Sequence, residues 1–295
     1  MTYHLPALST ESLKILEVNP HKIYIDATLG HGGHSQKILS LGATVYAIDQ
    51  DLTNIKIAQK RLQKKFPHKF FTIHDNFSNL EKIIKNNIKT PQKIGGLIFD
   101  LGLSVNQQKS VNRGFSFNDP DSLDMRLDPL STPLTAEMII NTYSGPELSR
   151  IFSFYAQEKL AIPLSQEIVR QRQITPIKTG LHLSSIVNSF YQKRSIKTKI
   201  NPSTKIFLAL RIVVNQEFDN LKKALNQTLS CLPPLCKVVV ISFHSGEDRL
   251  VKQFISGHFS KIKKLTTKAI QASPLEVRKN PLSRSALLRA YQIKS

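Results

Sequence analysis

Short apolar runs alternate with helical patterns over the first hundred residues, and this alternation constrains the fold more than any other feature. The runs cover residues 22–26, 44–49, 70–73 and 94–100, and each has the length and composition of a buried strand. Strands that are separated by helices of about a dozen residues pair in parallel through right-handed crossovers. The sequence therefore predicts an open α/β domain whose parallel sheet is covered by helices on both faces.

The alternation stops after residue 104 and resumes near residue 201. Residues 104–129 follow neither the strand period nor the helix period, and a connection of this length usually has a function. Helical patterns without strands between them then cover residues 137–143, 148–159, 164–172 and 181–194. We therefore predict a discontinuous domain, residues 1–104 and 201–295, with a loop and an all-helical subdomain inserted at residues 105–200.

The C-terminal third is expected to complete the sheet. One long helix is predicted from Pro202 to Leu225, because proline is accepted in a first helical turn and apolar residues recur at helical spacing. Capping patterns that begin at Ser78 and Ser144 predict the starts of two earlier helices. The elements predicted after the long helix are a strand, a helix and a strand at residues 237–243, 248–255 and 285–291.

The charge of the chain is strongly positive and unevenly distributed. There are 41 Lys and Arg residues against 21 Asp and Glu, a net charge of +20. Residues 193–295 hold 20 of the basic and 5 of the acidic residues, a net +15, which leaves +5 for residues 1–192. Such a charge attracts polyanions, so we predict a nucleic-acid partner. Lysines spread over a solvated surface by biased composition are the alternative.

Several classes of protein are not expected. No run of 18 consecutive apolar residues occurs and the N-terminus lacks an apolar core, so we expect neither a membrane partner nor a secretory signal. Cys231 and Cys236 have neither the spacing of a redox pair nor a second pair for zinc. We therefore expect a cytoplasmic, reduced protein that has no metal site.

The ends of the predicted strands carry the residues of a cofactor site. A turn with Gly30, Gly32 and Gly33 follows the first strand, and Asp49 ends the second strand 19 residues after Gly30. An acid at this spacing holds ribose hydroxyls in dinucleotide-binding folds. Asp100 ends the fourth strand and would face the same crevice. The pattern predicts a nucleoside cofactor, while a purely structural turn and a loop-capping aspartate are the alternatives.

Six regions of the chain together resemble one family, the MraW family of S-adenosylmethionine-dependent methyltransferases, which modify the exocyclic N4 of a cytidine in small-subunit (16S) ribosomal RNA. The matching motifs follow the family's order across residues 26–290. The resemblance implies a class I methyltransferase fold with a Rossmann-like open sheet, S-adenosylmethionine as cofactor and a target in the decoding region. The insert at residues 105–200 falls where the family has its proposed substrate-binding domain, so the resemblance also implies that this insert binds RNA. The motifs are DATLGHGGHS (26–35), FDLGLS (99–104), RGFSF with LDMR (113–117, 123–126), TKIFLALRI (204–212), ISFHSGEDR (241–249) and NPLSRSA (280–286).

The resemblance also implies roles for individual residues. Asp49 would bind the ribose and Phe77 would lie near the adenine. His34 as a residue that only begins a helix and Phe77 as an ordinary core aromatic are the alternatives. The full set implied to contact the cofactor is Gly32, Gly33, His34, Asp49, Phe77, Asp100 and Gln107.

A second set of residues is expected to hold the RNA. A target base must leave its stack to be modified, and arginine and aromatic side chains offer phosphate and stacking contacts to it. Packing of Phe115 and Phe117 at the subdomain junction, and a plain helix start at residues 244–245, are the alternatives. The expected substrate contacts are Arg113, Phe115, Arg126, His244 and Ser245.

The chemistry requires no metal, because the sulfonium is already an activated electrophile. Asp100 is the leading candidate to accept an N–H of the poorly nucleophilic N4 amine, and Ser104 is a weaker one. Residues 100–103 read Asp-Leu-Gly-Leu and lack the Pro-Pro-aromatic motif of DNA amino-methyltransferases, so DNA is not expected as a partner.

The chain departs from the family's pattern at four positions. Val105 and Asn106 replace the usual Ser-Pro, Gly246 replaces Leu, and Leu288 replaces a basic residue. These departures bear on the geometry of two loops and leave the class of protein unchanged. Three rival functions are left open, a pyridine-nucleotide oxidoreductase, a DNA methyltransferase and a non-enzymatic RNA-binding assembly factor. A homodimer is also left open.

Overall fold

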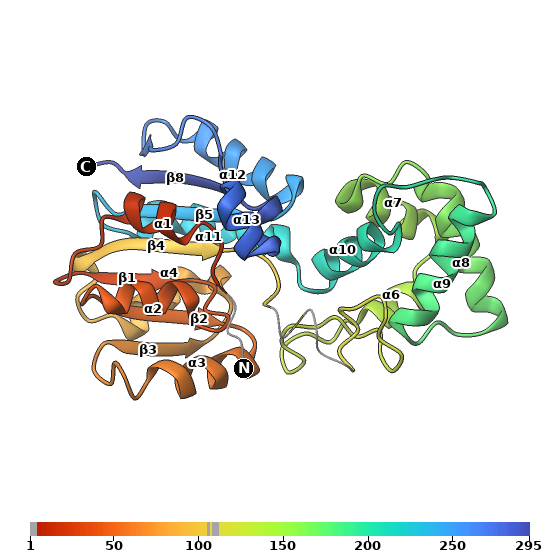
Figure 1. Cartoon of the computed structure of the whole chain (residues 1–295), viewed down its shortest axis with the longest axis horizontal. Coiled ribbons are helices and arrows are strands. Elements are labelled where there is room, and N and C mark those ends of the chain that lie inside the picture. Colours follow the sequence, from red (N-terminus) through yellow and green to blue (C-terminus); the bar gives the residue numbers. More distant parts are fainter. Residues whose placement is uncertain (1–4, 105–106, 108–111) are drawn as a thin grey trace. The chain divides into compact units, whose positions relative to one another are not determined.

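The structure is a computed structural model that describes residues 5–104, 107 and 112–295. It divides into two compact units. The first, which we call the sheet unit, comprises Met1–Ser104 and Phe218–Ser295, and the second, the helical unit, comprises Val105–Glu217. Figure 1 shows the sheet unit in red to orange and blue, and the helical unit in yellow-green to teal. In the part of the chain that is described, no helix is long and apolar enough to cross a membrane.

The sheet unit is built on one eight-stranded sheet with the order β3-β2-β1-β4-β5-β8-β6, and β7 pairs with β8. The strands from β3 to β5 run parallel, whereas β8 runs antiparallel to β5, β6 and β7. The predicted open, largely parallel α/β sheet is therefore confirmed. The strands are β1 (Ile23–Asp26), β2 (Thr44–Asp49), β3 (Phe70–His74), β4 (Ile94–Asp100), β5 (Lys237–Ser242), β6 (Ile262–Lys264), β7 (Ile270–Gln271) and β8 (Leu287–Ile293).

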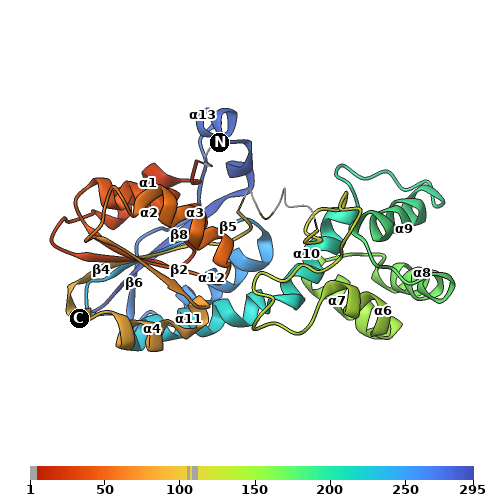
Figure 2. The same cartoon turned by 90° about the horizontal axis from the view of Figure 1, so that it is seen from below.

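Helices cover both faces of this sheet because its strands are apolar on both sides. In β5, Val238 and Val240 pack into one core while Val239 and Ile241 pack into the other. Helices α1 (Ser9–Leu16), α2 (Gly33–Ser40) and α3 (Leu52–Leu62) cover one face, and α4 (Leu80–Asn87), α11 (Glu217–Cys231) and α12 (Ser245–Gly257) cover the other (Figure 2). The remaining short elements are α13 (Pro274–Lys279) and the 3₁₀ turns η1 (Phe77–Asn79), η2 (Pro91–Lys93) and η3 (Pro281–Ser285).

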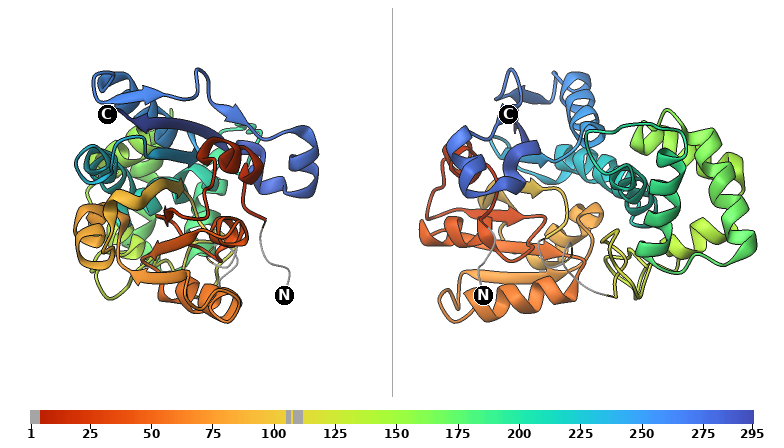
Figure 3. Two further views of the ribbon diagram at one scale, coloured as in Figure 1. Left: turned by 90° about the vertical axis from the view of Figure 1, so that its left-hand side faces the viewer. Right: turned by 45° about the vertical axis from the view of Figure 1, so that its right-hand side comes forward.

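The helical unit has a core of its own and, among its described residues, no strand (Figure 3). The predicted capping box at Ser144 is confirmed, since its side chain accepts from the backbone N–H of Glu147 and the Glu147 carboxylate accepts from the N–H of Ser144. The helices are α6 (Ala136–Thr142), α7 (Gly145–Ala156), α8 (Ala161–Ile174), α9 (Gly180–Gln192) and α10 (Ser203–Val214).

The second boundary of the insert differs from the expected one. We expected the sheet domain to resume at residue 201, but the helical unit extends to Glu217 and includes α10. The reason is packing, because Ile206, Phe207 and Leu210 of α10 are buried in the core of the helical unit. The apolar spacing of α10 predicts a helix correctly but does not indicate which core the helix joins.

The single long helix expected from Pro202 to Leu225 is wrong, since the structure has two helices there. The chain breaks between α10 and α11 at Gln216, whose backbone is left-handed with φ +49°. The Asn215 side chain donates to the carbonyl oxygen of Met125 at 2.8 Å and accepts from the N–H of Leu127 at 2.8 Å. These bonds hold the turn in place, and the partner segment is about ninety residues away in the sequence.

The predicted capping box at Ser78 is also wrong. The cap is Asn76, whose side chain accepts from the backbone N–H of Ser78 at 2.8 Å and opens the turn η1. The N–H of Glu81 donates to the Gln227 side chain of α11 at 3.0 Å. A tertiary contact therefore satisfies the amide at the start of α4, which a local cap was expected to satisfy.

Gly114 is expected to be essential for the loop that precedes α6. Its φ is +70°, and a Cβ there would lie 2.5 Å from the backbone nitrogen of Asp124. The backbone of Asp124 cannot move away without disrupting the loop. Gly114→Ala should therefore lower the free energy of unfolding of the helical unit by about 2–4 kcal/mol. Thermal unfolding would measure this, with Gly257→Ala as control, since a Cβ at Gly257 meets no atom of a described residue within 4 Å. Equal midpoints for the two variants would contradict the prediction.

Candidate active site

The carboxyl ends of the parallel strands bring three aspartates to one edge of the sheet. Asp26 ends β1, Asp49 ends β2 and Asp100 ends β4. These three strands are neighbours in the sheet, in the order β2-β1-β4. This edge is where open α/β sheets bind their ligands. The predicted grouping of Asp49 and Asp100 at one edge is therefore present, and Asp26 joins it.

Asp49 is held by three N–H donors. Its Oδ2 accepts from the backbone N–H of Gly30 at 2.8 Å and from Nδ2 of Asn54 at 3.1 Å, and its Oδ1 accepts from the N–H of Asp51 at 2.8 Å. A carboxylate has about four acceptor positions, so one on Oδ1 remains for a ligand. Burial raises the pKa of Asp49 to about 7, although these donors act against the shift.

Asn54 is a residue that the sequence analysis missed. It is buried in α3, and its Oδ1 accepts from the Ser104 hydroxyl at 3.1 Å while its Nδ2 donates to Asp49. It therefore links the end of β2 to the segment that follows β4. No sequence signal separates it from an ordinary helical asparagine, because the link joins residues 50 positions apart.

We expect Asn54→Leu to weaken cofactor binding by about 10-fold, since a hydrogen bond to a charged group contributes about 1.5–3 kcal/mol. The loss of a donor to Asp49 should also move the pH dependence of binding upward, because that donor lowers the pKa of Asp49. Calorimetric titration with the cofactor at several pH values measures both effects. Gln63→Leu, after the same helix, is the control, and a pH profile identical to wild type would contradict this role for Asn54.

Asp100 is positioned by contacts at both its backbone and its side chain. Its N–H donates to the Thr28 hydroxyl at 2.6 Å, and its Oδ2 lies 3.3 Å from Nε2 of the buried His34. The other oxygen, Oδ1, is buried and accepts no hydrogen bond from any residue that the structure describes. Such an unsatisfied acceptor is costly without a partner, so the geometry fits a bound donor at this point.

Asp26 lies beneath this pair and was also missed as a site residue. It is 1% exposed, and it accepts from the Ser35 hydroxyl at 2.6 Å and from the N–H of Thr28 at 3.3 Å. Burial raises the pKa of Asp26, while the nearby His34 lowers it. Asp26 thus holds both ends of the glycine-rich turn that leads from β1 into α2.

Within this turn, Gly32 and Gly33 are each favoured as glycine for a different structural reason. Gly32 has φ +78° and precedes α2, and a Cβ there would lie 2.7 Å from Cδ1 of Leu62. Gly33 is the first residue of α2, and its Cα faces Pro6, whose Cδ would be 2.9 Å from an added Cβ. Gly32 is therefore favoured by its left-handed backbone and Gly33 by its close packing against Pro6, in addition to any contact with a cofactor.

Phe77, which was expected near the adenine, lies at the end of the loop after β3. Its ring packs edge-on against Phe99 with centroids 5.6 Å apart and contacts the core beneath the sheet. It is only partly buried, so the core alternative does not account for the whole side chain.

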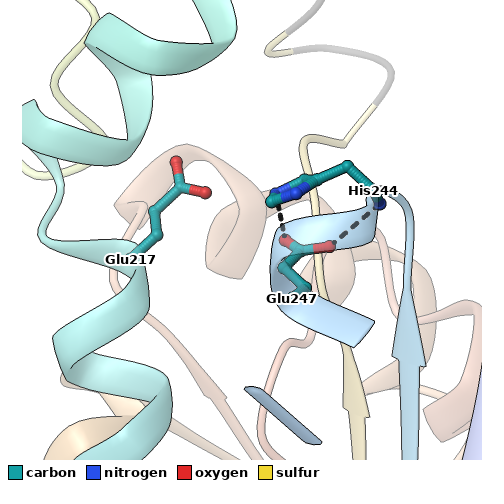
Figure 4. A group of neighbouring side chains, drawn as sticks. All are labelled: Glu217, His244 and Glu247. Carbon is teal, nitrogen blue, oxygen red and sulfur yellow. Dashed lines mark hydrogen bonds and ion pairs between the residues drawn. The ribbon is translucent and has the colours of Figure 1, made fainter. Parts of the chain in front are cut away.

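His244 begins α12 directly after β5. Glu247 accepts from the N–H groups of Phe243 at 2.8 Å and His244 at 3.4 Å, and its Oε1 lies 3.2 Å from Nε2 of His244 (Figure 4). The His244 ring also stacks on Phe218 at 5.7 Å, while Ser245 is exposed. The helix-start alternative is thus observed, and a substrate contact by these residues stays a prediction.

Known proteins match this chain over its full length. A sequence model of the MraW methylase family matches residues 1–294. The chain belongs to the MraW methylase family. Among relatives named ribosomal RNA small subunit methyltransferase H, that of Halothermothrix orenii is 38% identical and that of Thermomicrobium roseum 39% identical. The matches cover 99% of this chain in both cases, and 99% and 94% of the two relatives.

Membership of the MraW methylase family confirms the resemblance and the expected class of enzyme, a methyltransferase that uses S-adenosylmethionine. The oxidoreductase alternative is thereby excluded. The individual roles that the resemblance implies for the site residues remain predictions.

The remaining predicted residues of this MraW methylase belong to the helical unit. Arg126 forms a two-pronged ion pair with Asp124, with nitrogen–oxygen distances of 2.7 and 2.9 Å. Arg113 donates to the carbonyl oxygen of Arg126 at 2.9 Å and lies 5.1 Å from the Phe115 ring centroid, and Phe115 packs against the helical core. These side chains shape their own loop, and a contact between them and RNA stays a prediction.

Buried Asp119 is the centre of that loop and was not predicted. Its carboxylate accepts from the backbone N–H groups of Arg113, Gly114, Asp121 and Ser122 at 2.9–3.2 Å. This is why a segment with neither period is nevertheless ordered. Gln107 is buried in the same unit. Val105 and Asn106, at which the chain departs from the family pattern, lie outside the described residues.

Proposed function

We propose that this enzyme transfers the methyl group of S-adenosylmethionine to the exocyclic N4 of a cytidine in the decoding region of small-subunit (16S) ribosomal RNA. The names of its full-length relatives support ribosomal RNA as the substrate. The observation that carries the proposal is the buried Oδ1 of Asp100, which accepts no hydrogen bond from a described residue and lies at the sheet edge where Asp49 also ends its strand.

Residues of the sheet unit would hold the cofactor. Asp49 would accept a ribose hydroxyl at the free position of its Oδ1, and the exposed part of Phe77 would contact the adenine. Among the described residues, a Cβ at Gly30 would meet only Ser104, at 4.0 Å, which leaves room for a ligand beside this glycine. When bound, S-adenosylmethionine supplies an activated methyl group on its sulfonium.

Asp100 would act on the nucleophile. The N4 lone pair of cytidine is delocalised into the ring, and an acceptor on one N–H helps the amine to attack. Oδ1 of Asp100 is available as this acceptor, and His34 at 3.3 Å orients the carboxylate through Oδ2. Asp100 is therefore the proposed catalytic residue and His34 a positioning residue.

The RNA would contact both units. His244 and Ser245 follow β5 in the sheet unit, and Arg113, Phe115 and Arg126 lie in the ordered loop of the helical unit. Gln107 is retained as a proposed cofactor contact. Ribosomal RNA as the partner implies a cytoplasmic enzyme that does not act on DNA.

The proposal is tested by methyl transfer from labelled S-adenosylmethionine to small ribosomal subunits from cells that lack the enzyme. Nucleoside analysis of the RNA should find the label in N4-methylated cytidine, and subunits from cells that contain the enzyme should accept little label. Label in another nucleoside would contradict the proposed target atom. Cofactor binding without any transfer would favour the RNA-binding assembly factor instead.

A further inference from the structure

The helical unit contains a long stretch without any acidic residue. Residues 168–216 hold nine Lys and Arg residues and neither Asp nor Glu, so the stretch carries +9 in 49 residues. It spans the end of α8, all of α9 and all of α10. A positive stretch of this density attracts polyanions strongly unless its charges are neutralised within the fold.

Several of the nine cations are neutralised or used within the fold. Arg170 pairs with Glu167 at 2.6 Å, and Arg211 pairs with Glu217 at 2.7 Å. Arg172 donates to two carbonyl oxygens at the end of α6, at 2.6 and 2.7 Å. These arginines are structural, because their hydrogen bonds are already formed in the protein.

The lysines in the loop between α9 and α10 differ from these arginines, whose hydrogen bonds are formed within the protein. All nine residues from 192 to 200 are exposed, and Figure 2 shows this loop at the edge of the helical unit. Its lysines are Lys193, Lys197 and Lys199, and none of them forms an ion pair with a residue in the described part of the chain. All three lysines are exposed, although Lys193 lies near enough to Glu167 to contribute to the lowered pKa of that carboxyl.

The loop is nevertheless ordered near α9. The N–H of Ser195 donates to the carbonyl oxygen of Gln192 at 2.9 Å, and the N–H of Ile196 donates to that of Tyr191 at 3.1 Å. Arg194 lies over the Phe190 ring at 3.8 Å and donates to the carbonyl oxygen of Phe190. The lysines thus project from a turn that is attached to the helix end.

We propose that residues 193–200 bind the phosphate backbone of the RNA substrate through Lys193, Lys197 and Lys199. The inference rests on the proposed function, since that function makes the partner an RNA. Lysine ammonium groups are phosphate-binding point charges, and three of them within seven residues can follow successive phosphates. An anionic membrane is less suited, because membrane surfaces are bound by amphipathic helices and this loop is not helical.

The test compares two triple variants of equal charge change. One is Lys193→Gln, Lys197→Gln and Lys199→Gln, and the control replaces the exposed Lys60, Lys64 and Lys65 of the sheet unit by Gln. For three lost phosphate contacts, the affinity for small-subunit RNA should fall by about 30-fold at 0.2 M salt in the loop variant. The slope of log affinity against log salt should fall by about 2 in magnitude. S-adenosylmethionine affinity, measured by calorimetry, should be unchanged in both.

Each other outcome overturns the inference. Equal losses of RNA affinity in the two variants would mean that net charge is responsible and not this loop. Unchanged RNA affinity with lost binding to phosphatidylserine vesicles would assign the loop to a membrane. Failure of the proposed function is distinguishable, because wild-type enzyme would then transfer no methyl to the RNA, whereas RNA affinity is measured without turnover.

Discussion

Asp100→Asn is expected to lower kcat for methyl transfer by about 100-fold to 10,000-fold at saturating S-adenosylmethionine, the range typical of a lost general base. The substitution keeps the shape of the side chain and an oxygen that can accept a hydrogen bond. It removes the negative charge that would attract the N–H of the N4 amine as that amine becomes positive during attack. Single-turnover measurement of labelled methyl transfer to small-subunit RNA gives the rate directly.

The control for this experiment is Asp75→Asn. Asp75 follows β3 at the same end of the sheet, but its carboxylate is used by its neighbours Asn76 and Asn79. We expect this variant to keep a rate of methyl transfer within about threefold of wild type, because loss of the Asp75 carboxylate affects only the turn after β3. Retention of a tenth or more of kcat in Asp100→Asn would exclude Asp100 as the acceptor.

Cofactor affinity is expected to rise about 10-fold between pH 6 and pH 8. The reason is Asp49, whose pKa is about 7 because burial disfavours its charged form. The ionised carboxylate accepts a ribose hydroxyl better than the protonated one, so binding strengthens as pH rises through 7. Asp49→Asn should lose about 100-fold in affinity at pH 8 and show no such pH dependence. Calorimetric titration with S-adenosylmethionine from pH 6 to 8 measures both.

The raised pKa of Asp49 has the opposite effect on the stability of the cofactor-free protein, which should fall as the pH rises. The folded-state pKa of Asp49 lies above its unfolded value, so its contribution to stability is full below about pH 4 and is lost as pH rises through 7. Saturating cofactor should offset this loss, because it binds the ionised form.

For cofactor binding, a wild-type affinity that is constant from pH 6 to 8 would contradict the role of Asp49.

Most elements of the fold could be predicted from the sequence, because the spacing of apolar residues that marks a strand or helix lies within one short segment of the chain. The apolar runs that end in Asp26, Asp49 and Asp100 are buried strands, and parallel pairing places their ends at one edge. The two short strands β6 and β7 were missed, because two or three residues are too few to show a period.

The residues that support the site could not be predicted in the same way. Asn54 contacts Ser104, and Thr28 contacts Asp100, so each pair joins residues that are 50 or more positions apart. Polar residues such as these look the same in sequence whether they face solvent or hold a carboxylate. Only the pairing of β1 with its neighbours β2 and β4, and the packing of α3, bring them together.

The sequence by itself determined the α/β class, the helical insert, the strand-end aspartates and the resemblance to a methylase family, since periodicity, motif and order are properties of the chain. The tertiary structure alone decided that α10 joins the core of the helical unit and that the chain turns at Gln216. It also decided that Oδ1 of Asp100 is buried without a donor among the residues that the structure describes. The physical reason is that burial and hydrogen bonding depend on which distant segments meet, and local spacing does not specify this.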